Sequence, residues 1–295
     1  MRHLAPLALL ACSLASSALA IEGEWKAERW SSGLLQLSLT YGRTHNFGTN
    51  YDPSSFEGLS PAEIGAATRT PVSFALEGEA GRVTFEGAFE RGKGRGHFVF
   101  EPKLGYFDAV RALGVSDTRV HRQDPSATRD ERLLTLTLLD VSTAYIRSMI
   151  AEGYREDLDT YLTMRIFDVD PGYIRAMRAQ GFGDFSAEDL IAMRIHGVTP
   201  EFRDEMAQLG YRLTMDQLVA FRIHGVTRQW IEGLKEMGYD HVDADKLVST
   251  RIFQVTPAFI RELRDAGYPH LSIDELISMR VQGVTPDSLA KRRAI

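Results

Sequence analysis

The sequence predicts an α+β protein, in which an N-terminal antiparallel β-sheet domain precedes an α-solenoid of short helix-turn-helix repeats. Apolar and polar residues alternate with a period of two between Glu22 and Pro102, which is typical of strands that bury one face. Farther along the chain, a segment of 28 or 29 residues recurs. A repeat of this length indicates units that bury their apolar faces by stacking on one another.

The first twenty residues have the features of a secretory signal peptide. A short charged start is followed by an apolar stretch, residues 4–11, and by a small-residue cleavage site that ends at Ala20. We therefore expect a mature chain that begins near Ile21 and is periplasmic or secreted. The alternative is a lipid anchor at Cys12, which lies in a poor lipoprotein box. No later stretch reaches the ~20 apolar residues of a membrane-spanning helix.

The sheet domain is predicted to span residues 21–104 and to contain about five strands. The stretch from Thr44 to Thr70 is rich in Asn, Ser, Gly and Pro, so we expect a long loop there with one short helix at residues 61–67. The segment RGKGRG, residues 91–96, has the composition of a phosphate-binding loop. Such a loop needs a helix after it, whereas here a strand is predicted to follow, so a hairpin turn is the better interpretation.

The solenoid is predicted to span residues 105–295. Its first unit is imperfect, with a loop inserted at residues 116–130, and its last unit is truncated. In each unit a polar N-cap begins the first helix, and a glycine ends it. The predicted N-caps are Ser142, Asp170, Thr199, Thr227, Thr256 and Thr285. The predicted terminating glycines are Gly153, Gly181, Gly210, Gly238 and Gly267.

Each first helix carries an aromatic residue and, four positions later, a methionine or leucine. This spacing places both side chains on one buried stripe. The aromatic positions are Tyr145, Tyr173, Phe202, Trp230 and Phe259. The second helices are predicted to begin with capping boxes, of which Thr214 with Gln217 is the clearest.

In five of the repeat units an arginine lies near the end of the second helix. This arginine row is the first candidate binding site. Its members are Arg165, Arg194, Arg222, Arg251 and Arg280. One hypothesis is a line of guanidinium groups that holds carboxylates, either of an acidic peptide or of a C-terminus. The other hypothesis is structural: each cation is favoured at a helix end and pairs with an acid of a neighbouring unit.

Composition and motifs exclude several classes of function. The net charge of −6 argues against a nucleic-acid binder, although the VTP helix starts resemble those of a helix-hairpin-helix. His196 and His224 share one repeat position but lack further metal ligands, so we expect neither a metal nor a cofactor. No nucleophile or zinc motif of a known enzyme class is present, so we expect no enzyme, with an unrecognised hydrolase as a remote alternative.

The repeat sequence resembles that of repeats in bacterial envelope proteins. Examples are RIHGVTPEF (residues 194–202) and DELISMR (residues 274–280). Those repeats accompany, or are fused to, metallopeptidases of the beta-lactam-sensor type. The segment FEGAFERGKGRGHF, residues 85–98, is similar to the β-rich module that often precedes them. The zinc motif and membrane helices of the peptidase are missing here. The resemblance therefore implies a sensing or scaffolding role in the envelope without proteolysis.

The expected function is that of an exported, non-enzymatic interaction or scaffold protein that binds a protein or peptide partner through its solenoid. A membrane sensor or a peptidase of the envelope is a candidate partner. The alternative is a binder of peptidoglycan or another anionic glycan through the sheet domain, where the cations of the turn segment would meet the ligand. Those cations are Arg91, Lys93 and Arg95.

Overall fold

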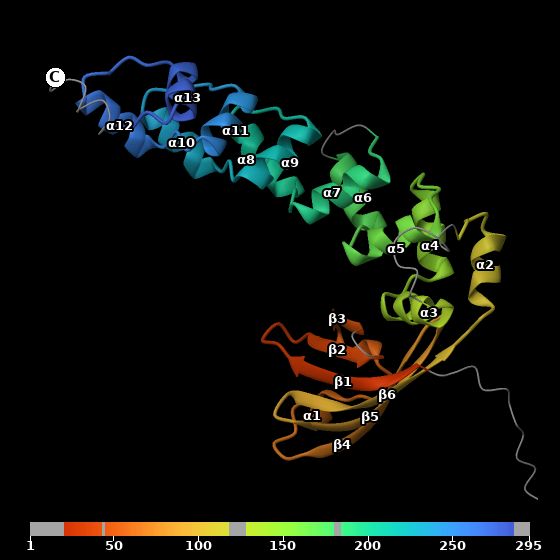
Figure 1. Ribbon diagram of the computed structural model, residues 1–295. Coiled ribbons are helices and arrows are strands. Elements are labelled where there is room, and N and C mark those ends of the chain that lie inside the picture. Colours follow the sequence, from red (N-terminus) through yellow and green to blue (C-terminus); the bar gives the residue numbers. More distant parts are fainter. Residues whose placement is uncertain (1–20, 43–44, 118–127, 180–183, 286–295) are drawn as a thin grey trace, which may run out of the picture. The chain divides into compact units, whose positions relative to one another are not determined.

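The computed structural model describes residues 21–42, 45–117, 128–179 and 184–285. It confirms the predicted fold class, because an antiparallel sheet is followed by a series of short helices (Figure 1). The predicted signal peptide, most of the predicted insertion at residues 116–130 and the end of the truncated last unit lie outside the described residues. Those residues form two compact units. The first contains the residues up to Arg147 together with Asp157–Leu162, so the boundary falls among the helices.

The sheet has six strands in the order β3-β2-β1-β6-β5-β4, and all neighbours are antiparallel. The strands are β1 (Ile21–Arg29), β2 (Leu35–Tyr41), β3 (His45–Tyr51), β4 (Thr70–Glu77), β5 (Gly81–Glu90) and β6 (Lys93–Pro102).

Strand β3 corrects the prediction of a long loop between Thr44 and Thr70. This strand lies at the edge of the sheet and pairs only with β2, and its side chains alternate between half-buried and exposed. An edge strand needs few apolar residues, so it leaves no clear alternation in the sequence. The short helix expected in this stretch is present as α1 (Pro61–Ile64), and a capping box between Ser60 and Glu63 begins it. A single 3-10 turn, η1 (Pro53–Ser55), precedes it.

An aromatic cluster fills the concave side of the curled sheet. Trp25 on β1 contacts Phe74 on β4 with ring centroids 5.3 Å apart, although β6 and β5 lie between these strands. Such a contact requires that the sheet curl around its core. Phe56, from the segment after β3, lies 5.3 Å from Phe74 and 5.1 Å from Tyr51. The core therefore connects both edges of the sheet.

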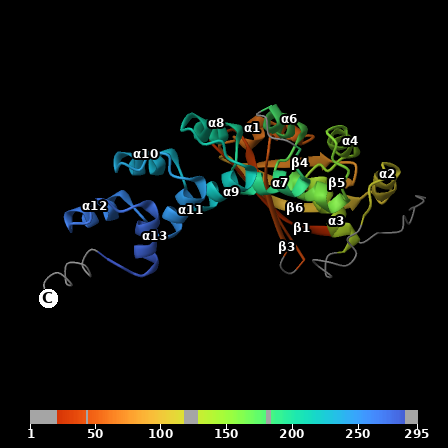
Figure 2. The same cartoon turned by 90° about the horizontal axis from the view of Figure 1, so that it is seen from above.

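The helices alternate between first and second members of the repeat units. The first helices are α2 (Tyr106–Ala112), α4 (Thr143–Ala151), α6 (Pro171–Ala179), α8 (Pro200–Gln208), α10 (Arg228–Glu236) and α12 (Pro257–Asp265). The second helices are α3 (Arg129–Leu138), α5 (Leu158–Ile166), α7 (Ala187–Ile195), α9 (Met215–His224), α11 (Ala244–Ile252) and α13 (Ile273–Val281). Figure 2 shows α6, α8, α10 and α12 in one row and α7, α9, α11 and α13 in another.

Helix starts and ends follow the predicted capping residues. Thr199 accepts a hydrogen bond from the backbone N–H of Phe202, and Ser142, Asp170, Thr227 and Thr256 make the same contact in their units. Gly210 has a φ of 90°, and the N–H after it, of Tyr211, donates to the carbonyl of Met206, which is a Schellman end. The glycines at 153, 238 and 267 also have positive φ. Gly181 lies outside the described residues.

Candidate functional site

Four arginines of the row stack on the aromatic residue of the first helix before them. The Arg222 guanidinium lies 4.1 Å from the ring centroid of Phe202, at the distance of a cation–π contact. The other three pairs have distances between 3.9 and 4.7 Å. These pairs are Arg194 with Tyr173, Arg251 with Trp230, and Arg280 with Phe259.

The same guanidinium groups bind the preceding unit. Arg222 Nε donates to the carbonyl oxygen of Gly197 at 2.7 Å, just beyond the end of α7. Carbonyls at a helix end lack partners within the helix, so a cation is favoured there. The remaining contacts are Arg194 to Asp168, Arg251 to His224 and Arg280 to Phe253.

These contacts support the structural hypothesis for the arginine row but correct the predicted partner. We expected an acid of a neighbouring unit, whereas in the described residues none of Arg194, Arg222, Arg251 and Arg280 forms an ion pair. Each guanidinium group stacks on an aromatic ring and donates a hydrogen bond to a backbone carbonyl instead. Arg165 occupies the equivalent position on α5 and is half-buried. The row therefore joins successive units, and its guanidinium groups are already engaged.

An aliphatic row stands beside the arginine row and was not predicted. It consists of the residue after each arginine, and its side chains are 49% to 60% exposed: Ile166, Ile195, Ile223, Ile252 and Val281. The helical period contains a signal for this exposure. In α7 the buried residues are Ala187, Leu190 and Met193, and Ile195 lies about 200° around the helix from Met193.

Two further rows extend this surface along the second helices. Four residues before the aliphatic row, a second set of aliphatic side chains is half-buried: Ile191, Val219, Val248 and Ile277. Seven residues before it, a set of carboxylates is exposed: Glu188, Asp216, Asp245 and Asp274. Because positions i, i+3 and i+7 share a helix face, the three sets lie on one side. Neighbouring second helices contact one another from α7 to α13, so the rows are continuous.

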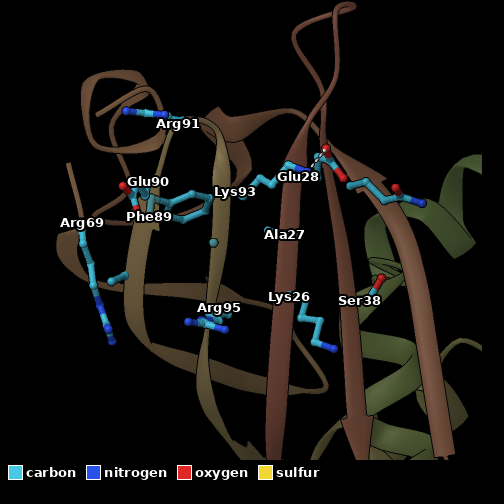
Figure 3. A pocket seen from close by; sticks show the side chains of 13 residues that line it. Lys26, Ala27, Glu28, Ser38, Arg69, Phe89, Glu90, Arg91, Lys93 and Arg95 are labelled. Carbon is cyan, nitrogen blue, oxygen red and sulfur yellow. Dashed lines mark ion pairs between the residues drawn. The ribbon is translucent and has the colours of Figure 1, made fainter. Parts of the chain in front are cut away.

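The cations of the turn segment lie on the sheet, as the alternative hypothesis requires. Arg91 and Gly92 form a two-residue turn between β5 and β6, with φ values of 50° and 80°. This confirms the hairpin turn, because two positive φ values are typical of a type I′ turn. Arg91, Lys93 and Arg95 all line one hollow of about 750 Å³ on the solvent-exposed face of the sheet (Figure 3).

The remaining polar groups give no sign of a metal centre. Within the described residues, no group of three or more His, Cys, Asp or Glu side chains could hold a metal ion. The two histidines of the sheet domain each lie beside one acid: His45 Nδ1 is 3.2 Å from Glu131, and His97 Nε2 is 3.6 Å from Glu22.

No single helix among the described residues is long and apolar enough to cross a membrane. The bent pair α3 and α4, with 68° between the helices, passes that test by length and composition only. Comparison with protein-family models, with curated proteins and with solved structures finds no match for this chain.

Proposed function

We propose that the protein is an exported, non-enzymatic scaffold that binds a partner polypeptide through the second-helix face of its repeats. The observation that carries the proposal is the aliphatic row. Exposed apolar groups that form a continuous line, rather than scattered single residues, are typical of interaction surfaces. Repeat proteins offer such extended surfaces because every unit presents the same position to solvent.

Comparison of the units within the chain strengthens this interpretation. The exposed position is Ile in four units and Val in the fifth, and about half or more of each side chain faces solvent. The next position, also at the helix end, varies freely: Phe167, His196, His224, Phe253 and Gln282. Uniformity at an exposed site beside variation at its neighbour points to a contact made outside the fold.

Charge indicates the chemistry of the partner. The carboxylate row borders the aliphatic rows. Asp274 pairs with Lys246 at 2.7 Å and Asp245 accepts from Gln217, whereas Glu188 and Asp216 form no ion pair with any described residue. The guanidinium groups on the other side contact rings and carbonyls. A partner segment with apolar side chains and a flanking line of Lys or Arg would match this surface. This replaces the earlier expectation of an acidic or C-terminal peptide, which depended on free guanidinium groups.

A triple substitution tests the proposal. The variant Ile195→Ser, Ile223→Ser and Ile252→Ser removes the exposed aliphatic groups while the buried stripe remains. With a photo-crosslinking amino acid at position 219, the otherwise wild-type protein should capture a partner segment rich in Lys and Arg, in extracts of the cells that produce it. The triple variant should capture none.

The control carries the crosslinker at position 261, on the exposed side of α12, where capture should be absent. Undiminished capture by the triple variant, or a captured segment that is acidic, would contradict the proposal. Thermal unfolding of the triple variant should show only a modest fall in Tm, because each of the three side chains is already about half exposed. A large fall in Tm would show that the row is structural.

A further inference from the structure

The hollow on the sheet contains a pair of like charges that the fold does not need. Lys26 on β1 lies directly opposite Arg95 on β6 in the strand register. Like charges opposite one another on neighbouring strands destabilise a sheet. Their outer neighbours in the same row are Ser38 on β2 and Ala88 on β5, so no carboxylate of that row compensates them.

Two more cations border this pair. Arg69, just before β4, and Arg91, in the hairpin turn, line the same hollow (Figure 3). Within the described residues, the side chains of Lys26, Arg69, Arg91 and Arg95 form neither an ion pair nor a hydrogen bond. The hollow is lined by five cations and by two carboxylates, Glu28 and Glu90, so its formal charge is +3 in a chain of net charge −6, which creates a local positive potential.

Lys93 differs from the other cations of the hollow. Its Nζ lies 3.1 Å from Glu28 Oε1, directly across the strands, and Glu90 lies opposite it in the hairpin (Figure 3). In this row of the sheet the single cation therefore has a carboxylate on either side. Of the three cations that the sequence singled out, Arg91 and Arg95 remain available to a ligand, and Lys93 does not.

One end of this face carries an exposed indole. Trp30 lies two residues after Glu28 and four after Lys26, so its side chain shares their face of the sheet. Its backbone N–H donates to the carbonyl of Leu34, and the residue is 46% exposed. Its Nε1 donates to Gln36 Oε1 at 3.2 Å, and Gln36 itself lines the hollow. Trp30 follows Lys26 by four residues, so the two lie about 13 Å apart along the strand.

We propose that this face binds an acidic oligosaccharide. A sugar ring would lie on the indole of Trp30, because the negative π face attracts the polarised C–H groups of a pyranose. The carboxylate of another sugar unit of the same oligosaccharide would lie between Lys26 and Arg95, where Arg can bind it through two parallel hydrogen bonds. Ser38 and Gln36 supply polar groups for sugar hydroxyls.

The test uses the full chain and a galacturonate hexamer, with its fully methyl-esterified form as the neutral match. Calorimetry at low salt should show binding of the acid and at least tenfold weaker binding of the ester, and binding should weaken as salt is added. The double variant Lys26→Ala and Arg95→Ala should lose at least tenfold in affinity. Arg111→Ala, which removes a cation of α2 outside the hollow, should bind as the wild type does.

Two further results decide the class of ligand. Trp30→Ala should weaken binding of the hexamer, and a hexaglutamate peptide should bind the wild type more weakly than the hexamer does. Equal binding of acid and ester, an undiminished affinity of the double variant, or equal binding of hexaglutamate would each overturn the proposal. The double variant should remain folded with an unchanged or higher Tm, because it removes a repulsive pair.

Discussion

Replacing Arg222 with alanine should destabilise the repeats, because two contacts between units are lost together. The guanidinium lies 4.1 Å from the Phe202 ring centroid, and Nε donates to the carbonyl of Gly197 at 2.7 Å. A cation–π contact at an exposed site contributes about 0.5–1 kcal/mol. A charged hydrogen bond contributes about 1.5–3 kcal/mol when it is shielded from water. Arg222 is exposed, so the hydrogen bond contributes less here.

The expected loss is about 1.5 kcal/mol, which lowers Tm by about 3–6 °C for a unit of this size. Thermal unfolding followed by far-ultraviolet circular dichroism measures it, because helices dominate that signal. Arg261→Ala is the matched control: Arg261 is an exposed helix residue that makes no ion pair or hydrogen bond with any described residue. Its Tm should lie within about 1 °C of the wild type.

A lysine at the same position separates charge from shape. Arg222→Lys keeps the cation but loses the flat guanidinium that lies on the ring, so it should recover only part of the lost stability. If Arg222→Ala unfolds at the same temperature as Arg261→Ala, the two contacts do not stabilise the stack and the structural account of the arginine row fails. If Arg222→Ala also fails to bind the partner while its Tm is unchanged, the arginine row is a binding site.

Two other predictions follow from the same contacts and from the buried tyrosines. Gly225→Ala should destabilise the repeats more than Gly210→Ala: both glycines have positive φ, but a Cβ at 225 would lie 2.9 Å from Arg251 Nη2, whereas none of the described residues crowds position 210. Thermal unfolding of both variants gives the comparison, and equal losses would contradict the crowding. Burial raises the pKa of Tyr51 well above its ordinary value of 10, and its hydroxyl donates to the Leu138 carbonyl at 2.7 Å. The neutral form therefore stabilises the fold fully below pH 10, and above it the unfolding free energy should fall by about 1.4 kcal/mol per pH unit for this tyrosine. Urea unfolding at pH 9 and pH 11 should show a smaller fall for Tyr51→Phe, and an unchanged fall would exclude Tyr51 as its source.

The helix boundaries could be predicted from the sequence because they depend on residues close together in the chain. Thr199 and Gly210 begin and end α8 as expected, because capping depends on residues within a few positions of each other. The position that follows the second helix of a unit has a left-handed backbone but does not always hold a glycine. Asp168 and Gln254 occupy the positions of Gly197 and Gly225 with φ values of 53°, so packing between units can impose the left-handed conformation on other residues.

Contacts between distant segments account for what the sequence did not predict. Lys26 and Arg95 are opposite each other only because β1 and β6 are neighbours, and no local pattern shows that pairing. The partner of Arg222 likewise depends on how one unit is placed on the next. Side-chain alternation predicted the faces of the strands, whereas the order of the strands decided which cations lie opposite one another.

The two rows on the second helices differ in what the fold demands of them. The partner of each arginine varies among Tyr, Phe and Trp, since any aromatic face satisfies the cation. The exposed aliphatic position does not vary in the same way, although Ile and Val have lower helix propensity than Leu or Ala. A position that stays β-branched and about half exposed in five units is what the proposed partner would require, if the units bind it together.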